Sequence, residues 1–267
     1  MTSYAAPERL LALGTAYTRH HDALSGLLHS GTRSPHAFAR HVPRTQALAR
    51  EALDVPPLLH GMSLYFSPDV RSGLDRIKQL ATPAATAADH LLDAVDFLHD
   101  APPPTTSLES MTVSHRRALW EAGRHIGLAL QLTALGADDC LDTAALFARQ
   151  LHRQKIAPEH QLLPLSPTQH TTLSAVARGC VSVHHEDGKV WTDRGEARVP
   201  ISTVRALETR GLVLRETCPR PARQDRIHLT PDGRRTLAAS LGRPHTTPRT
   251  TRPAARAAPN TRHTASR

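Results

Sequence analysis

Aromatic and cysteine residues are scarce in this sequence, and each shortage excludes a class of protein. Phe, Trp and Tyr make up 3% of the 267 residues, so a core must be built chiefly from Leu, Ala and Val. The three cysteines, Cys140, Cys180 and Cys218, are an odd number without a Cys-x-x-Cys spacing. This pattern argues against a disulfide framework and favours a reducing compartment.

Long apolar runs and the common catalytic motifs are also missing. No apolar run approaches the roughly 20 residues that span a bilayer, and no signal-peptide pattern opens the chain. We therefore expect a cytoplasmic protein without a membrane partner. The sequence contains no Gly-x-x-x-x-Gly-Lys phosphate loop, no Gly-x-Gly-x-x-Gly and no Gly-x-Ser-x-Gly. We predict that the chain is not an enzyme and uses no cofactor.

Histidine is abundant, with 18 residues, but its spacing does not indicate a metal site. His115 and His125 lie ten residues apart on one predicted helix, which places them about three turns apart. That separation is too large for them to share an ion. The sequence has no His-Glu-x-x-His motif and no Cys/His grouping at zinc spacing. We therefore predict no metal ion.

Positive charge is concentrated toward the end of the chain. Lys and Arg number 33 and Asp and Glu 24, which gives a formal net charge of +9 at pH 7. Residues 1–165 carry 15 basic and 16 acidic side chains, whereas residues 166–241 carry 12 and 8. Residues 242–267 hold six arginines and no acidic residue. A polyanionic partner is therefore expected to bind the later part of the chain.

Leu and Ala recur every three or four residues over the first 156 positions, which predicts helix after helix. Ser67-Pro68 and Thr82-Pro83 each predict the start of a separate helix. Proline is tolerated at the first helical position, because the backbone N–H that it lacks would have no hydrogen-bond partner within the helix. The two longest helices are expected from about Ser110 to Leu135 and from about Asp139 to Lys155. Gly136 is expected to end the first of them in the left-handed conformation. An all-α helical bundle is the predicted result.

The pattern changes after residue 165, where β-prone stretches alternate with short helices. Ser166-Pro167 predicts the start of a helix that ends at Gly179. Asp187-Gly188 lies between two β-prone segments and predicts a β-hairpin over residues 180–192. The remaining predicted elements are a helix at 200–210, strands at 212–217 and 226–229, and a last helix from Thr230-Pro231 to about Leu241.

This order of elements resembles the winged helix-turn-helix domain of MarR and PadR-type regulators. The segment ISTVRALETRGLVLRE (201–216) is similar to their recognition helix and first wing strand, and RIHLTPDGRRTL (226–237) to their second wing strand and next helix. The resemblance implies a DNA-binding winged helix. One feature departs from the family, because a second helix normally precedes the recognition helix where residues 180–199 are β-prone here. Either a β-hairpin replaces that helix, or the predicted strands are wrong.

Helix 200–210 supplies the candidate DNA-contacting residues. Ile201, Val204 and Leu207 fall at three-residue spacing and are predicted to face the core. Small hydroxyl side chains near the helix start permit close approach to a DNA backbone, and Arg205 can donate two hydrogen bonds to a guanine edge. The residues predicted to face outward are Ser202, Thr203, Arg205, Ala206, Thr209 and Arg210.

The presumed wing and the tail add further positive charge. Residues 242–267 have no large aliphatic side chain, so they are predicted to be disordered and free to lie along a polyanion. If their arginines neutralise phosphates, log affinity falls with log salt by up to about 0.9 per contact. An ordinary solvated surface and a compositional bias toward Arg are the alternative explanations. The arginines in or beside the presumed wing are Arg220, Arg223 and Arg226.

Two hypotheses for function follow. In the first, the protein is a transcriptional regulator that binds double-stranded DNA as a homodimer near the nucleoid, in response to an unknown effector. Its expected parts are an all-α domain at 1–160 for dimerisation or sensing, a winged helix at 161–241 and the basic tail at 242–267. In the second, the winged helix is a protein-interaction adaptor, since fold does not decide function. A neutral or apolar face on helix 200–210 would favour the adaptor.

Overall fold

The structure, a computed structural model, describes residues 4–30, 34–60, 67–100, 113–156, 158, 164–184, 190–192, 199–218 and 224–243. Helices account for 77% of these residues, and short strands form a small antiparallel sheet, so the mainly helical fold class is confirmed. None of the described helices combines the length and the apolar character that a membrane crossing requires. The predicted disordered tail lies outside the described residues, apart from Gly242 and Arg243.

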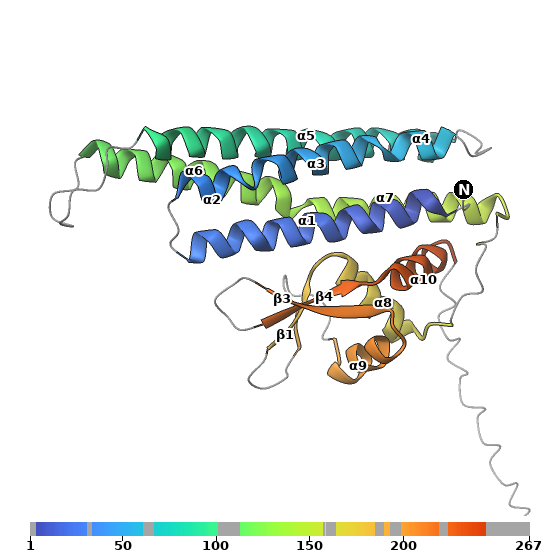
Figure 1. The fold of residues 1–267 in the computed structure, drawn as a ribbon. Coiled ribbons are helices and arrows are strands. Elements are labelled where there is room, and N and C mark those ends of the chain that lie inside the picture. Colours follow the sequence, from blue (N-terminus) through green and yellow to red (C-terminus); the bar gives the residue numbers. More distant parts are fainter. Residues whose placement is uncertain are drawn as a thin grey trace, which may run out of the picture.

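The first part of the chain consists of long helices that run alongside one another (Figure 1). Helix α1 packs against α7, and α5 packs against both α3 and α6. Leucines and alanines fill these contacts, as the sequence predicts. The helices are α1 (Ala5–His29), α2 (Pro35–Ala39), α3 (Val42–Leu53), α4 (Val55–His60), α5 (Pro68–His99), α6 (Val113–Ala134) and α7 (Gly136–Arg153).

The predicted helix start at Thr82-Pro83 is wrong, because Pro83 lies inside the continuous helix α5. An interior proline removes one helical hydrogen bond and costs about 3 kcal/mol. Buried residues on both sides of it, including Ile77, Leu80 and Ala84, form one apolar stripe along α5. Burial of this stripe against α3 and α6 outweighs the cost of the proline, which no local signal in the sequence reveals.

The predicted helix stop at Gly136 is also wrong, because Gly136 is the first residue of α7. A Cβ atom at this position would lie 2.4 Å from Cδ1 of Tyr17, whose side chain is buried in α1. The glycine is thus required for close approach of α7 to α1 rather than for chain reversal. Only Leu135 separates α6 from α7.

The later part of the chain alternates short helices with strands. Helix α8 begins with the capping box of Ser166 and Gln169, and Gly179 follows it with a positive φ of 71°. The sheet has the order β2-β1-β4-β3, and all its pairs are antiparallel. The elements are α8 (Pro167–Ala177), β1 (Val181–His184), β2 (Val190–Thr192), α9 (Ile201–Thr209), β3 (Val213–Thr217), β4 (Gln224–Leu229) and α10 (Pro231–Leu241).

Strands β1 and β2 occupy the place where the regulators named above carry a second helix. Val181 is paired with Thr192 and Val183 with Val190, as the predicted hairpin requires. The turn itself, including Asp187-Gly188, lies outside the described residues. Within the described part of the chain, no helix lies between α8 and α9. Strand β1 also pairs with β4, so it joins the two strand pairs into one sheet.

One apolar core runs through both parts of the chain. The same cluster of buried side chains includes Leu10 and Phe147 from the long helices and Leu173, Ile227 and Leu237 from the later elements. Helix α10 packs against both α1 and α7. In Figure 1 the sheet and its helices accordingly lie along the side of the molecule formed by α1 and α7.

Candidate functional site

Helix α9 presents a small polar face to solvent. Val204 and Leu207 are buried beneath it, and Ile201 is partly buried, as the three-residue spacing predicts. The Arg205 side chain is exposed and makes no hydrogen bond or ion pair with another described residue, whereas its backbone carbonyl accepts from the Thr209 hydroxyl over 3.0 Å. Thr203 is half-buried. The predicted outward residues that the structure leaves exposed are Ser202, Arg205, Ala206 and Thr209.

Arg210, predicted to face outward, is held at the end of α9. Its guanidinium donates to Oε1 of Gln169 over 3.0 Å and to the carbonyl oxygen of Pro164 over 3.1 Å. Because Gln169 belongs to the capping box of α8, Arg210 ties the end of α9 to the beginning of α8. Its side chain would have to leave these partners to reach a nucleic acid.

Glutamates reduce the positive charge beside α9, and the sequence prediction did not take them into account. Arg215 on β3 forms a two-pronged ion pair with Glu208 on α9, with 3.0 Å between one guanidinium nitrogen and Oε2. The hydrogen bonds that Arg215 donates to the Glu208 carboxylate raise the pKa of its guanidinium. Arg19 on α1 pairs with Glu216 on β3 at 2.7 Å. Arg220 and Arg223 lie outside the described residues.

Arg226 does not lie on an exposed wing, so this predicted phosphate contact is corrected. Its side chain is 3% exposed and points from β4 toward α1. Nε and one terminal nitrogen donate to the two carboxylate oxygens of Asp22, each over 2.9 Å, and the other donates to the carbonyl of Gly179 over 2.7 Å. A bidentate buried pair of this kind is broken only at high cost. The sequence could not reveal it because 204 residues separate the partners.

A cavity of about 370 Å³ lies between α1, α5, α6 and the start of α7. Leu80, Leu128 and Leu132 give it apolar walls, and His90 and Asp139 bring polar groups to it. Burial raises the pKa of the Asp139 carboxyl, with a smaller contribution from Asp142. A mostly apolar cavity with a few polar groups suits a small organic ligand.

The hydroxyl of Tyr17 does not offer a free polar group to this cavity. It donates to the carbonyl oxygen of Leu80 over 2.8 Å. That hydrogen bond joins α1 to α5, one turn before Pro83, which also lines the cavity. Contributions from four separate elements explain why no sequence motif marks this cavity.

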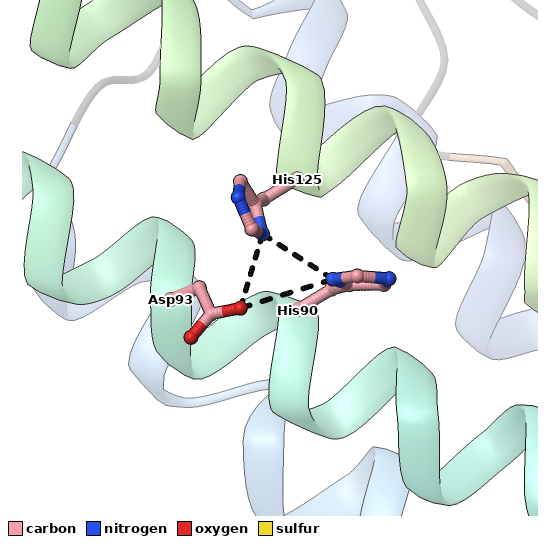
Figure 2. Close-up of side chains that lie close together, drawn as sticks. All are labelled: His90, Asp93 and His125. Carbon is pink, nitrogen blue, oxygen red and sulfur yellow. Dashed lines mark hydrogen bonds and ion pairs between the residues drawn. The ribbon is translucent and has the colours of Figure 1, made fainter.

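Three metal-ligating side chains come together on α5 and α6, in contrast to the expectation from the sequence. His90 and Asp93 lie three residues apart on one face of α5, and His125 reaches them from α6 (Figure 2). The three candidate ligand atoms lie within 4.8 Å of one another. The i, i+3 spacing of His90 and Asp93 is the one signal in the sequence that could have indicated them. His115, the residue considered with His125 at first, is not part of the cluster.

Comparisons with known proteins leave these sites to be interpreted from the chain itself. No protein-family model matches the sequence, and neither the curated proteins nor the solved structures gave a match. The resemblance to winged-helix regulators therefore depends on the order of the elements and on segments 201–216 and 226–237.

Proposed function

We propose that this protein binds double-stranded DNA in a sequence-specific manner and regulates transcription, with α9 as the helix that enters the major groove. The observation that carries the proposal is the exposed face of α9, where Arg205 is flanked by Ser202, Ala206 and Thr209. Small side chains around a single unpaired arginine allow a helix to approach base edges closely. A neutral or apolar face would favour the adaptor function, whereas the exposed Arg205 makes this face positively charged and polar.

The exposed face of α9 offers one group suited to a base edge and one suited to a phosphate. Arg205 can donate two parallel hydrogen bonds to O6 and N7 of guanine, the commonest specific contact in the major groove. Ser202 lies in the first turn, where unbonded backbone amides and the helix dipole favour a phosphate oxygen. Phosphate contacts fix the orientation of the helix, and the base contact supplies sequence preference.

Strands β3 and β4 are proposed as the wing beside α9. They pair in register from Val213 with Leu229 to Thr217 with Asp225, and residues 218–223 connect them. Arg220 and Arg223 fall in this connection, and six further arginines follow from residue 243 onward. Because Arg210, Arg215 and Arg226 have partners within the protein, the wing connection and the tail are the proposed source of salt-dependent affinity.

The proposed regulator acts as a homodimer through its long helices. Val113 and Trp120 are seven residues apart on one face of α6 and are 74% and 64% exposed. Large exposed side chains of this kind are typical of the centres of protein interfaces, where Trp is enriched. Light scattering of the full chain and of Trp120→Ser tests this proposal. A wild-type monomer at micromolar concentration would contradict it.

Selection from a random duplex library with the full chain, followed by fluorescence anisotropy on the selected duplex, tests DNA binding. Arg205→Ala is expected to weaken binding by about 1–3 kcal/mol and to relax the preference at one base pair. Arg71→Ala is the matched control, because Arg71 is exposed on α5, on the opposite side of the molecule from α9 in Figure 1.

Two results would overturn the proposal. The first is the absence of any duplex binding by the folded wild-type chain at low salt. The second is an equal loss of affinity in Arg205→Ala and Arg71→Ala, which would mean that positive charge alone is responsible. The first result would favour the adaptor function, and the second would indicate non-specific binding to polyanions.

A further inference from the structure

His90 and Asp93 on α5 and His125 on α6 form a cluster between these two helices, and both helices lie away from α9 in Figure 1. Nδ1 of His90 lies 3.2 Å from Nδ1 of His125, and Oδ2 of Asp93 lies 3.2 Å from the same nitrogen of His125. Oδ2 of Asp93 lies 3.9 Å from Nδ1 of His90. Figure 2 shows the two rings and the carboxylate converging on one small space.

These separations can be compared with those around a zinc ion. Bonds of about 2.0–2.2 Å at tetrahedral angles place neighbouring ligand atoms about 3.3–3.5 Å apart. Two of the three separations are 3.2 Å and already fit this geometry. The third, 3.9 Å, requires a shift of about half an ångström, and Asp93 can supply it because its side chain is 52% exposed.

We propose that His90, Asp93 and His125 bind a divalent transition-metal ion of the zinc class, with the fourth coordination position open. Two imidazoles and one carboxylate are ligands that zinc readily accepts, and three protein ligands leave one position for water or another ligand. The ion would hold α5 and α6 together, since each helix supplies at least one ligand. The proposal does not depend on DNA binding.

Arg124 competes with the ion for His125. One of its terminal nitrogens lies 2.9 Å from Nε2 of His125, and a guanidinium only donates, so Nε2 accepts. Neutral His125 then carries its proton on Nδ1, the atom that would bind the metal. When the metal binds Nδ1, that proton moves to Nε2. Arg124 is then displaced, because Nε2 carries an N–H and no longer accepts its hydrogen bond.

Arg124 can leave His125 at little cost. Its side chain is about half exposed, and its Nε also pairs with Glu121 at 3.0 Å, one turn earlier on α6. The guanidinium can therefore keep its contact with Glu121 while it releases the His125 ring. Contacts of exposed charged side chains contribute little to stability, so the loss of one of them costs little. Arg124 therefore favours the metal-free tautomer of His125, and the ion favours the tautomer that releases Arg124.

His90 belongs to both the metal cluster and the wall of the 370 Å³ cavity. The bound ion and any molecule in the cavity therefore contact the same side chain. This arrangement would let occupation of the cavity change the affinity for the ion, and the reverse by the same factor.

Titration of the metal-free full chain with Co²⁺, followed by displacement with Zn²⁺, tests the site. Visible absorption of Co²⁺ reports nitrogen and oxygen ligation, and far-UV circular dichroism checks that each variant is folded. The wild-type chain is expected to bind one ion tightly. Asp93→Asn and His125→Gln are each expected to raise the dissociation constant at least tenfold. Asp93→Asn is the safer variant for folding, because Asp93 is exposed.

Two further variants make the test specific. His99→Gln is the matched control, because His99 is exposed on the same helix outside the cluster, and its dissociation constant is expected to equal that of the wild type. Arg124→Met removes the competing donor and is expected to tighten binding several-fold. The proposal fails if no saturable site exists, if Asp93→Asn and His125→Gln bind as tightly as the wild type, or if Arg124→Met weakens binding.

Discussion

The long helices α1 to α7 and the later elements α8 to α10 with their sheet differ in how they are stabilised. Helix pairs such as α5 with α6 bury long continuous stripes of Leu and Ala. The later elements are short, and their apolar residues join the core of the helices rather than form a separate one. The sheet therefore depends on α1 and α7 for its stability, and the polar contact that joins them is buried.

The buried pair of Asp22 and Arg226 is the strongest polar link between the two parts. We expect Asp22→Ala or Arg226→Ala to destabilise the protein by about 3–5 kcal/mol, because each leaves one buried charge without its partner. Urea unfolding followed by circular dichroism measures this loss. The double variant Asp22→Leu/Arg226→Met is expected to recover much of the stability, since an apolar pair often replaces a buried ion pair well. A loss below 1 kcal/mol in both single variants would show that the two parts are not coupled here.

Replacement of a glycine by alanine is expected to change the stability of the protein in opposite directions at two positions, one in each part. A Cβ atom at Gly233 on α10 would lie 1.9 Å from the carbonyl oxygen of Leu212, so Gly233→Ala is expected to cost about 1–3 kcal/mol. A Cβ atom at Gly123 on α6 meets no atom within 4 Å, so Gly123→Ala is expected to stabilise the helix by up to about 1 kcal/mol. Thermal and urea unfolding of both variants measure the difference. Equal effects would contradict the close approach of α10 to the start of β3.

Acid is expected to destabilise both parts through one buried histidine in each. Burial, with His41 and Arg44 nearby, lowers the pKa of His20 on α1 to about 3. Burial and Arg19 lower the pKa of His228 on β4 to about 4. The unfolded chain keeps the ordinary value near 6.5, so below that pH it binds more protons than the folded protein does. Stability therefore falls as the pH drops from about 6.5 toward 4, on the order of 1 kcal/mol per pH unit for each ring.

Urea midpoints measured between pH 7 and pH 4.5 test this expectation. His228→Gln is expected to lower the slope of stability against pH by the contribution of one buried histidine, on the order of 1 kcal/mol per pH unit. His99→Gln is the control, because it removes an exposed histidine and leaves both buried rings in place. An identical slope in the wild type and His228→Gln would contradict the burial of a neutral His228.

Several local features could be predicted from the sequence because neighbouring residues determine them. The helix start at Ser166-Pro167, the helix stop at Gly179, and the inward side of α9 with Val204 and Leu207 all lie where their patterns indicate. Each depends on hydrogen bonds or a helical period within a few residues. The exposed residues of the candidate site on α9 follow from the same period.

Other features could not be predicted because their causes lie far away in the chain. Pro83 remains inside α5 because buried residues before and after it belong to a helix that packs against α3 and α6. Position 136 requires a glycine because Tyr17 packs against it. Arg226 is removed from the predicted DNA-binding set by Asp22 on α1. The three residues of the proposed metal site meet only because α5 packs against α6.

The sequence by itself determined the helical class, the positions of the β-prone segments, and the concentration of positive charge after residue 165. Composition and short-range periodicity carry that information, because helices and turns are stabilised largely within a few residues. Only the tertiary structure decided which arginines have partners and which histidines lie together. Those outcomes depend on the burial of charged and ring groups between distant helices, where desolvation forces each group to find a partner.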